Sequence, residues 1–165
     1  MRRLRFLSLA ALAVLTLAPV STATAAQAAV AAPTNLYYLK DRPVAEGYVN
    51  SGLITINGQA YPRSIYSGFY VGSIAETQYN LYRRCNRFEY VIGITDDYST
   101  SNSVARFEVY GDNRRLKVIQ LGFGRAAHQA VNVTHVLRLK VVVLGIKGNG
   151  YGGWGDASVR CTVLP

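Results

Sequence analysis

The residues that could do chemistry gather in one glycine-rich segment near the C-terminus. Residues 145–156 read Gly-Ile-Lys-Gly-Asn-Gly-Tyr-Gly-Gly-Trp-Gly-Asp and include the only Trp of the chain. Because glycine readily adopts φ > 0, we expect a loop here that holds Tyr151 and Trp154 in unusual orientations. Aromatic rings stack on the C–H face of a sugar, and Asn149 and Asp156 offer groups that bond to its hydroxyls. The segment therefore predicts a carbohydrate-binding loop, with Tyr70 as a further ligand-binding candidate.

Trp154 has a structural alternative that the sequence leaves open. A single Trp beside Gly-Asp-Ala-Ser-Val can also pack as core under the last strand. The same choice between core and ligand-facing positions applies to Tyr66, Tyr70 and Tyr151. Whether Trp154 and Tyr151 are exposed together therefore decides the interpretation.

Catalytic residue types are scarce. His128 and His135 are the only histidines, and neither lies in a nucleophile, zinc or phosphate motif. Residues 148–155 also lack the Lys-Ser/Thr and following helix of a phosphate loop. We expect no enzyme, because catalysis would require one of the histidines to meet a carboxylate in a cleft.

Several Asp residues could supply oxygen ligands to a structural Ca²⁺. Asp96, Asp97 and Asp112 fall in turns between expected strands, and Asp156 joins them as a further candidate. Asp in a turn also caps backbone N–H groups. The sequence offers both roles for these carboxylates.

The N-terminus has the pattern of a secretory signal peptide. Arg2, Arg3 and Arg5 precede an apolar stretch over residues 6–20, and small residues follow. Residues 1–28 are predicted as the signal, with cleavage after Ala25 or Ala28, and Ala31 fits the same rule. The apolar run is shorter than the roughly 20 residues of a membrane span. We expect a secreted, extracellular protein that is not membrane-anchored after cleavage.

The two cysteines both lie in the exported part. Cys85 and Cys161 meet an oxidising compartment, so a disulfide between them is the simplest expectation, and two buried free thiols are the alternative. Closing this loop would stabilise the fold by roughly 4 kcal/mol in the loop-entropy account.

The rest of the chain has strand and turn composition. Short β-branched and aromatic stretches alternate with turn signals, among them Asn57-Gly58 and Gly111-Asp112-Asn113, which predict two hairpins. Residues 136–144 are apolar enough for a buried central strand. After a flexible leader over residues 29–34, we expect one domain over residues 35–165, an all-β jelly-roll sandwich of about nine strands.

The charge is basic but scattered. Without the three signal arginines, 15 Lys and Arg residues stand against 9 Asp and Glu, which gives a net charge of +6. The cations are spread along the strands rather than clustered, as they are on a solvated surface. We expect a monomer that binds no nucleic acid, with anionic polymers as possible electrostatic partners.

Six groups of residues follow one another in an order and spacing that are typical of one family: 38–41, 56–61, 68–71 with 79–81, 88–97, 107–112, and 148–150 with 154–157. Together they resemble the NPCBM family of carbohydrate-binding modules, found attached to family 98 glycoside hydrolases. The chain departs from the family pattern at Gly72, where a His is common, and at Gly152-Gly153. The resemblance implies a galactose-binding-like β-sandwich.

Two functions follow as hypotheses. The first is a secreted, non-catalytic module that binds cell-wall or environmental polysaccharide through Trp154, Tyr151, Asn149, Asp156 and Tyr70. The alternative is a secreted sandwich without sugar specificity that binds a protein or an anionic polymer, suggested by the +6 charge and the departures at Gly72 and Gly152. No cofactor is expected beyond the Ca²⁺ that the Asp residues could hold.

Overall fold

The computed structural model describes residues 34–163, and the predicted signal peptide and its cleavage sites lie outside this range. In chain order the elements are β1 (Asn35–Tyr38), the 3-10 turn η1 (Leu39–Asp41), β2 (Glu46–Gly47), β3 (Asn50–Ile56), β4 (Gln59–Tyr70), β5 (Ile74–Asn80), β6 (Cys85–Ile94), β7 (Val104–Gly111), β8 (Arg114–Gly122), β9 (Ala126–Asn132), β10 (Arg138–Lys147) and β11 (Asn149–Cys161). No helix within residues 34–163 has the length and hydropathy that crossing a membrane requires.

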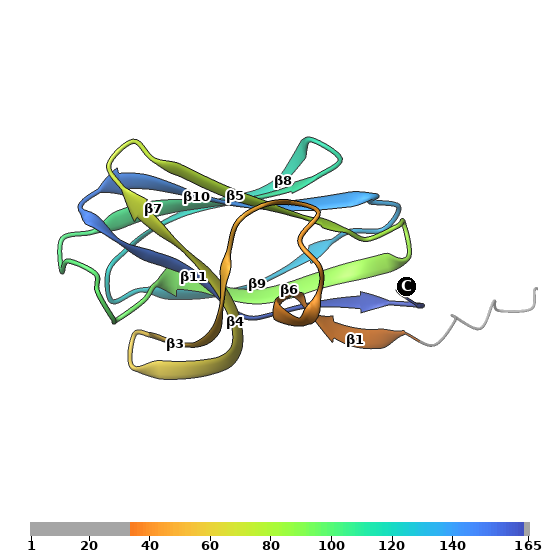
Figure 1. Ribbon diagram of the computed structural model, residues 1–165, viewed down its shortest axis with the longest axis horizontal. Helices are drawn as coiled ribbons and strands as arrows, with labels where there is room; N and C mark the ends of the chain where they lie inside the picture. Colours follow the sequence, from red (N-terminus) through yellow and green to blue (C-terminus); the bar gives the residue numbers. More distant parts are fainter. Residues whose placement is uncertain (1–33, 164–165) are drawn as a thin grey trace, which may run out of the picture. The chain divides into compact units, whose positions relative to one another are not determined.

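The strands form two antiparallel sheets packed face to face, which confirms the predicted β-sandwich. One sheet has the order β3-β4-β11-β6-β9, with β1 also paired to β11, and the other has the order β2-β5-β10-β7-β8. Figure 1 shows β5, β7, β8 and β10 in one layer and β4, β6, β9 and β11 in the other. Within residues 34–163 eleven strands form where about nine were expected. The short β2 has no strong signal in the sequence, and β11 is far longer than predicted.

Both predicted hairpins are present. Asn57 and Gly58 join β3 to β4 with φ of 50° and 75°, and Asp112 and Asn113 join β7 to β8 with φ of 49° and 67°. Two successive positive φ values define the turn whose twist matches that of paired strands, and Asn, Asp and Gly tolerate them best. The two turns therefore set the register of their hairpins.

The core lies between the inner faces of the two sheets. Along β6 the side chains of Phe88, Tyr90, Ile92 and Ile94 alternate with outward ones, and all four are buried. In the other sheet β10 lies between β5 and β7, which confirms the predicted central strand, although it begins at Arg138. The sandwich thus buries a continuous apolar layer that fixes both sheets.

A disulfide joins Cys85 to Cys161, as predicted. Cys85 begins β6 and Cys161 ends β11, and the two residues are directly paired across these neighbouring strands. The bond links the end of β11 to the start of β6, its neighbour in the same sheet. Neither cysteine is free.

Candidate functional site

The glycine-rich segment is a strand rather than the predicted loop. Only Gly148, at φ 66°, makes the turn between β10 and β11, and residues 149–161 then run through the centre of the first sheet. A Cβ atom at Gly152 would lie 2.5 Å from Val143 Cγ1 across the core, and one at Gly153 would lie 2.5 Å from Ile54 Cδ1 on the outer face. The glycines are present because neighbouring side chains already fill both faces of this strand.

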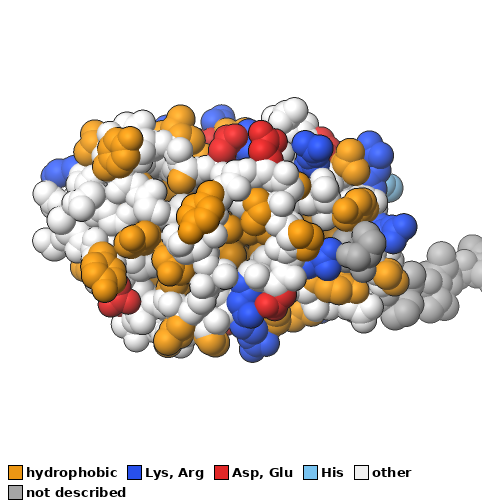
Figure 2. Space-filling model, viewed as in Figure 1, with side chains coloured by type: hydrophobic (Ala, Val, Ile, Leu, Met, Phe, Trp, Pro, Cys, Tyr) orange, Lys and Arg blue, Asp and Glu red, His pale blue; other side chains and the backbone are white. Residues whose placement is uncertain are grey.

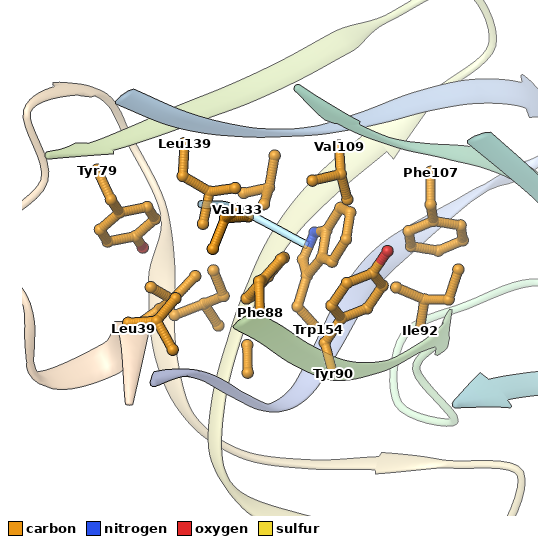
Figure 3. Packing of buried hydrophobic residues seen from close by; sticks show 14 of the residues in the cluster. Leu39, Tyr79, Phe88, Tyr90, Ile92, Phe107, Val109, Val133, Leu139 and Trp154 are labelled. Carbon is orange, nitrogen blue, oxygen red and sulfur yellow. The ribbon is translucent and has the colours of Figure 1, made fainter. Parts of the chain in front are cut away.

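Trp154 belongs to the core, so its predicted role as an exposed stacking platform is corrected. The residue is 2% exposed, and its ring lies edge-on to Tyr90 at 5.2 Å and to Phe107 at 5.7 Å between ring centroids. Figure 3 shows Trp154 between Tyr90, Phe107 and Val109 inside the sandwich. It points inward because strand alternation places residue 154 on the same face as residue 152. The ring therefore stabilises the fold and is not available to a ligand.

The β3–β4 hairpin folds over the outer face of the first sheet. Its residues Ile54 and Ile56 are buried without being part of the main core cluster. The hairpin rests on positions without side chains: a Cβ at Gly93 would lie 2.3 Å from Ile56 Cγ2, one at Gly153 would lie 2.5 Å from Ile54 Cδ1, and one at Gly155 would lie 2.7 Å from the Tyr61 ring. We call Gly93, Gly153 and Gly155 the glycine floor. The floor lets the hairpin approach the sheet and become one wall of the site.

Asp96 fastens the tip of this hairpin. Its carboxylate oxygens accept the N–H groups of Asn57 at 2.9 Å and of Gly58 at 2.8 Å, and its own N–H donates to the carbonyl of Thr55 at 2.8 Å. These bonds satisfy the turn's donors and link it to the loop that follows β6. Asp96 is thus a structural cap at the edge of the site.

A hollow opens between the hairpin, β11 and the loop after β6. Its cavity volume is about 170 Å³. We call it the tyrosine hollow. Its lining residues are Asn50, Leu53, Ile54, Tyr66, Thr95, Asp97, Tyr98 and Tyr151. The strands that pair around it bring together residues about 100 positions apart in the sequence.

Three tyrosine rings form the aromatic part of the tyrosine hollow. Tyr151 is edge-on to Tyr66, with centroids 5.5 Å apart, and edge-on to Tyr98, with centroids 6.3 Å apart. Tyr98 is 87% exposed and has a left-handed φ of 57°. Tyr66 and Tyr151 are partly buried, so Tyr98 presents the most accessible ring. The cluster offers apolar ring surface next to hydroxyl groups.

The loop that carries Tyr98 is held by hydrogen bonds. The hydroxyls of Thr95 and Ser99 donate to the carbonyl of Asp97 at 3.0 and 3.3 Å, and Ser99 Oγ accepts the N–H of Tyr151 at 3.3 Å. The Asp97 carboxylate itself has no hydrogen-bond partner within residues 34–163 and lines the hollow. The site therefore combines a fixed loop with one carboxylate free to accept hydrogen bonds from a ligand.

The remaining predicted ligand residues are separated by the structure. Asn149 and Tyr70 pair across β11 and β4 at the same end of the sheet as Tyr151, but neither lines the tyrosine hollow. Asp156 lies further along β11 and accepts the N–H of Arg63 at 2.9 Å. Of the predicted ligand-binding residues, the structure places Tyr151 alone in this hollow.

The predicted calcium ligands do not come together. Asp112 accepts the N–H groups of Leu137 and Arg138 at the end of β7 opposite to the loop with Asp96 and Asp97. Burial by itself raises the pKa of Asp112. The two N–H donors and the charge of Arg83 lower it by more, so the pKa of Asp112 lies below its ordinary value. Residues 34–163 contain no group of three or more His, Cys, Asp or Glu side chains placed to hold a metal. Turn capping is the role that the structure gives to Asp96 and Asp112.

A separate hollow brings His128 near carboxylates. Its volume is about 290 Å³, and Glu89, His128 and Asp156 line it along with Tyr38 and Tyr61. Glu89 is already engaged, since Arg87 lies 2.8 Å and Arg160 3.3 Å from its oxygens. Burial raises the pKa of Glu89, but these two arginines more than offset it and lower the net pKa. Within residues 34–163, His128 forms no hydrogen bond with the carboxylate of Glu89 or Asp156.

Sequence reasoning missed Tyr98, Asn50 and Leu53. Tyr98 carries a usable signal, because an aromatic residue inside the polar run 96–103 has no strand pattern to bury it. Asn50 and Leu53 carry none, since they reach the site only when the hairpin folds back over the sheet.

Comparison with known proteins agrees with this architecture. The module CBM51 from a family 95 glycoside hydrolase of Clostridium perfringens, solved with methyl-galactose, superposes with a TM-score of 0.61 at 20% identity and covers 76% of this chain and 99% of that one. The tandem CBM51 modules of a family 98 glycoside hydrolase from Streptococcus pneumoniae give a TM-score of 0.63 at 13% identity, covering 76% of this chain and 47% of that one. These likenesses show the fold.

A third neighbour is part of a larger protein. The CBM51-2 and INT domains of Clostridium perfringens ZmpB, solved with GlcNAc, give a TM-score of 0.63 at 19% identity over 77% of this chain. The chain spans 32% of that structure and 15% of a longer ZmpB structure that includes its M60 catalytic domain. A search of curated proteins found no match.

The family itself is identified over most of the chain. Residues 20–160 match the NPCBM/NEW2 domain, in agreement with the resemblance of the sequence segments and with the sandwich seen here. The chain therefore belongs to the NPCBM/NEW2 domain family of carbohydrate-binding modules.

Proposed function

We propose that the protein is a secreted, non-catalytic module that binds a glycan in the tyrosine hollow. The observation that carries the proposal is the cluster of Tyr66, Tyr98 and Tyr151 beside the unpaired carboxylate of Asp97. A tyrosine face packs on sugar C–H groups, and a carboxylate accepts hydrogen bonds from sugar hydroxyls. The solved CBM51 neighbours hold methyl-galactose and GlcNAc, which supports a sugar ligand here as well.

The size of the hollow favours part of a glycan. Its volume of about 170 Å³ is below the roughly 300–1,000 Å³ of sites that enclose drug-sized ligands. A site of this size accommodates about one sugar ring and leaves the rest of the chain outside. Binding is therefore expected to be weak and to depend on a few contacts.

The non-catalytic part of the proposal is supported by the family match and by the CBM51 neighbours, which are carbohydrate-binding modules. In the hollow that His128 lines, Glu89 is held by two arginines and Asp156 accepts a backbone N–H. Secretion is supported by the disulfide between Cys85 and Cys161, which persists in an oxidising compartment.

The alternative of an anionic polymer receives less support from this site. The chain has a net positive charge, but no Lys or Arg lines the tyrosine hollow. On the face shown in Figure 2, Lys and Arg gather mostly over the right half, whereas hydrophobic and uncharged side chains dominate the left half, where β3 lies in the same view. The charge and the aromatic hollow are thus separate features of the surface.

The test is a titration of the protein with methyl-galactoside and with GlcNAc by calorimetry, beside a glycan array. Replacing Tyr98 by Ala is expected to weaken binding about fivefold to tenfold, because stacking on an aromatic ring contributes about 1–1.5 kcal/mol. The melting temperature is expected to stay unchanged, since Tyr98 is 87% exposed.

Tyr82 provides a matched control. It is also an exposed tyrosine at left-handed φ, 53° against 57° for Tyr98, but it follows β5 at the other end of the sandwich. Tyr82→Ala is expected to bind as the wild type does. A folded wild type that no glycan binds, or a Tyr98→Ala variant with full affinity, would contradict the proposal.

A further inference from the structure

Another depression, distinct from the hollow beside His128, adjoins the tyrosine hollow on the side facing β5. We call it the side groove; its volume is about 390 Å³. It is lined by Tyr48, Asn50, Ser67, Gly68, Ile74, Ala75 and Glu76. Tyr48 is 77% exposed and Ile74 is also exposed, so the groove presents one aromatic ring and one aliphatic side chain to solvent.

The side groove and the tyrosine hollow share Asn50, and Gly68 of the groove lies beside Tyr151 of the hollow. Asn50 lines both, and its side-chain oxygen accepts a hydrogen bond from the hydroxyl of Tyr48 at 3.1 Å. Gly68 lies beside the Tyr151 ring, and a Cβ there would be 3.5 Å from Tyr151 Cε1. A side chain at Gly68 would stand beside the Tyr151 ring, so the glycine leaves this boundary between the two depressions without one.

The charges along both depressions are of one sign. Asp97 lines the tyrosine hollow and Glu76 lines the side groove, while neither is lined by Lys or Arg. Lys140 pairs with Glu76 at 3.5 Å but does not line the groove. Carboxylates accept hydrogen bonds from neutral hydroxyls and repel other carboxylates, so this surface selects against acidic sugars although the chain as a whole is basic.

We propose that the side groove is a second sugar subsite, so that the protein binds a neutral glycan chain across at least two rings, one on Tyr151 and Tyr98 and the next on Tyr48. The inference rests on the proposed function, because the second subsite extends the same glycan-binding site. Tyr48 positions the second ring, and Asn50, held by the Tyr48 hydroxyl, contacts the ligand at the junction of the two subsites. The substrate class is a neutral oligosaccharide or polysaccharide.

The test compares matched ligands by calorimetry. Methyl-galactoside and GlcNAc probe the tyrosine hollow alone, while α-1,4-galactobiose and β-1,4-chitobiose reach the side groove. The disaccharide of the sugar that binds is expected to bind about tenfold more tightly than its monosaccharide, the effect of one further stacked ring. Digalacturonic acid, which has the linkage of galactobiose plus two carboxylates, is expected to bind at least tenfold more weakly than galactobiose.

Variants separate the two subsites. Tyr48→Ala is expected to abolish the gain from the second ring and to lower monosaccharide affinity much less, because it also releases Asn50 from the Tyr48 hydroxyl; Tyr82→Ala is the control that changes neither. Ile74→Ala tests the groove without touching Asn50 and is expected to reduce only disaccharide binding. Equal affinity for monosaccharide and disaccharide, or equal losses of both in Tyr48→Ala, would overturn the second subsite while the tyrosine hollow stands. Absence of binding to every sugar would overturn the proposed function together with it.

Discussion

Adding one methyl group to the glycine floor tests how the β3–β4 hairpin is seated. In Gly93→Ala the new Cβ would lie 2.3 Å from Ile56 Cγ2 and 2.7 Å from the carbonyl oxygen of Arg125. Neither neighbour is the flexible end of a side chain, since Cγ2 branches at Ile56 Cβ and the other atom is backbone. The strand and the hairpin must therefore move apart.

The expected cost is about 1–3 kcal/mol, the range for overpacking a close-packed site. Gly122→Ala is the control, because its Cβ would meet nothing closer than the Ser103 carbonyl at 3.8 Å. That variant is expected to be neutral or to gain up to about 1 kcal/mol from a less flexible unfolded chain. Equilibrium urea unfolding of both variants measures the difference in free energy.

A double-mutant cycle identifies the contact responsible. Ile56→Ala removes Cγ2, so Gly93→Ala combined with it is expected to be less destabilising than the sum of the single changes, by about 0.5 kcal/mol or more. Gly93→Ala is also expected to weaken glycan binding, because Asn50 and Leu53 on β3 line the tyrosine hollow. If Gly93→Ala is as stable as Gly122→Ala, the hairpin does not rest on Gly93 and the reasoning is refuted.

Two further predictions concern the core. Trp154→Ala is expected to cost about 3–5 kcal/mol in thermal or urea unfolding, and wild-type stability in this variant would contradict the burial of the ring. Tyr90→Phe removes a buried hydroxyl that has no hydrogen-bond partner within residues 34–163, so it is expected to stabilise the fold by about 1 kcal/mol. Burial raises the pKa of Tyr90 and Tyr79 above the ordinary 10.0, so the unfolded chain loses these protons first and stability falls as the pH rises above about 10. Tyr90→Phe is expected to reduce that fall by about 1.4 kcal/mol per pH unit, and equal slopes for both proteins would rule it out.

The sequence was sufficient for the parts of the fold that local chemistry determines. Asn57-Gly58 and Asp112-Asn113 form their turns because these residue types accept positive φ. β10 is central because residues 141–144 within it are apolar on both faces. The disulfide could be predicted because the chain has only two cysteines and the compartment expected for it is oxidising. Each of these inferences needs only residues close in sequence or a pair without competitors.

The glycine-rich segment shows where local reasoning fails. Six glycines in twelve residues indicate a loop when only the backbone is considered. In the structure the same glycines are needed because Val143, Ile54 and Tyr61 occupy the space on either side of β11. Those partners lie 9 to about 100 positions from the glycines in the sequence. The segment itself contains no signal that predicts these contacts. The same packing turns Trp154 inward, so the predicted loop was wrong, and of the two roles left open for Trp154 the structure shows the core one.

The site itself depends on that packing. The glycine floor lets the hairpin fold onto the sheet, the folded hairpin brings Asn50 and Leu53 to Tyr151, and Asp96 fixes the hairpin tip to the loop that presents Tyr98. The segment predicted from sequence to bind the ligand therefore contributes mainly through glycines, whose missing side chains leave space for the hairpin. Its glycines make room for the wall of the tyrosine hollow, and the ring of Tyr151 is the one group that it supplies directly. A change that fills the floor is thus expected to impair the site without touching any residue that lines it.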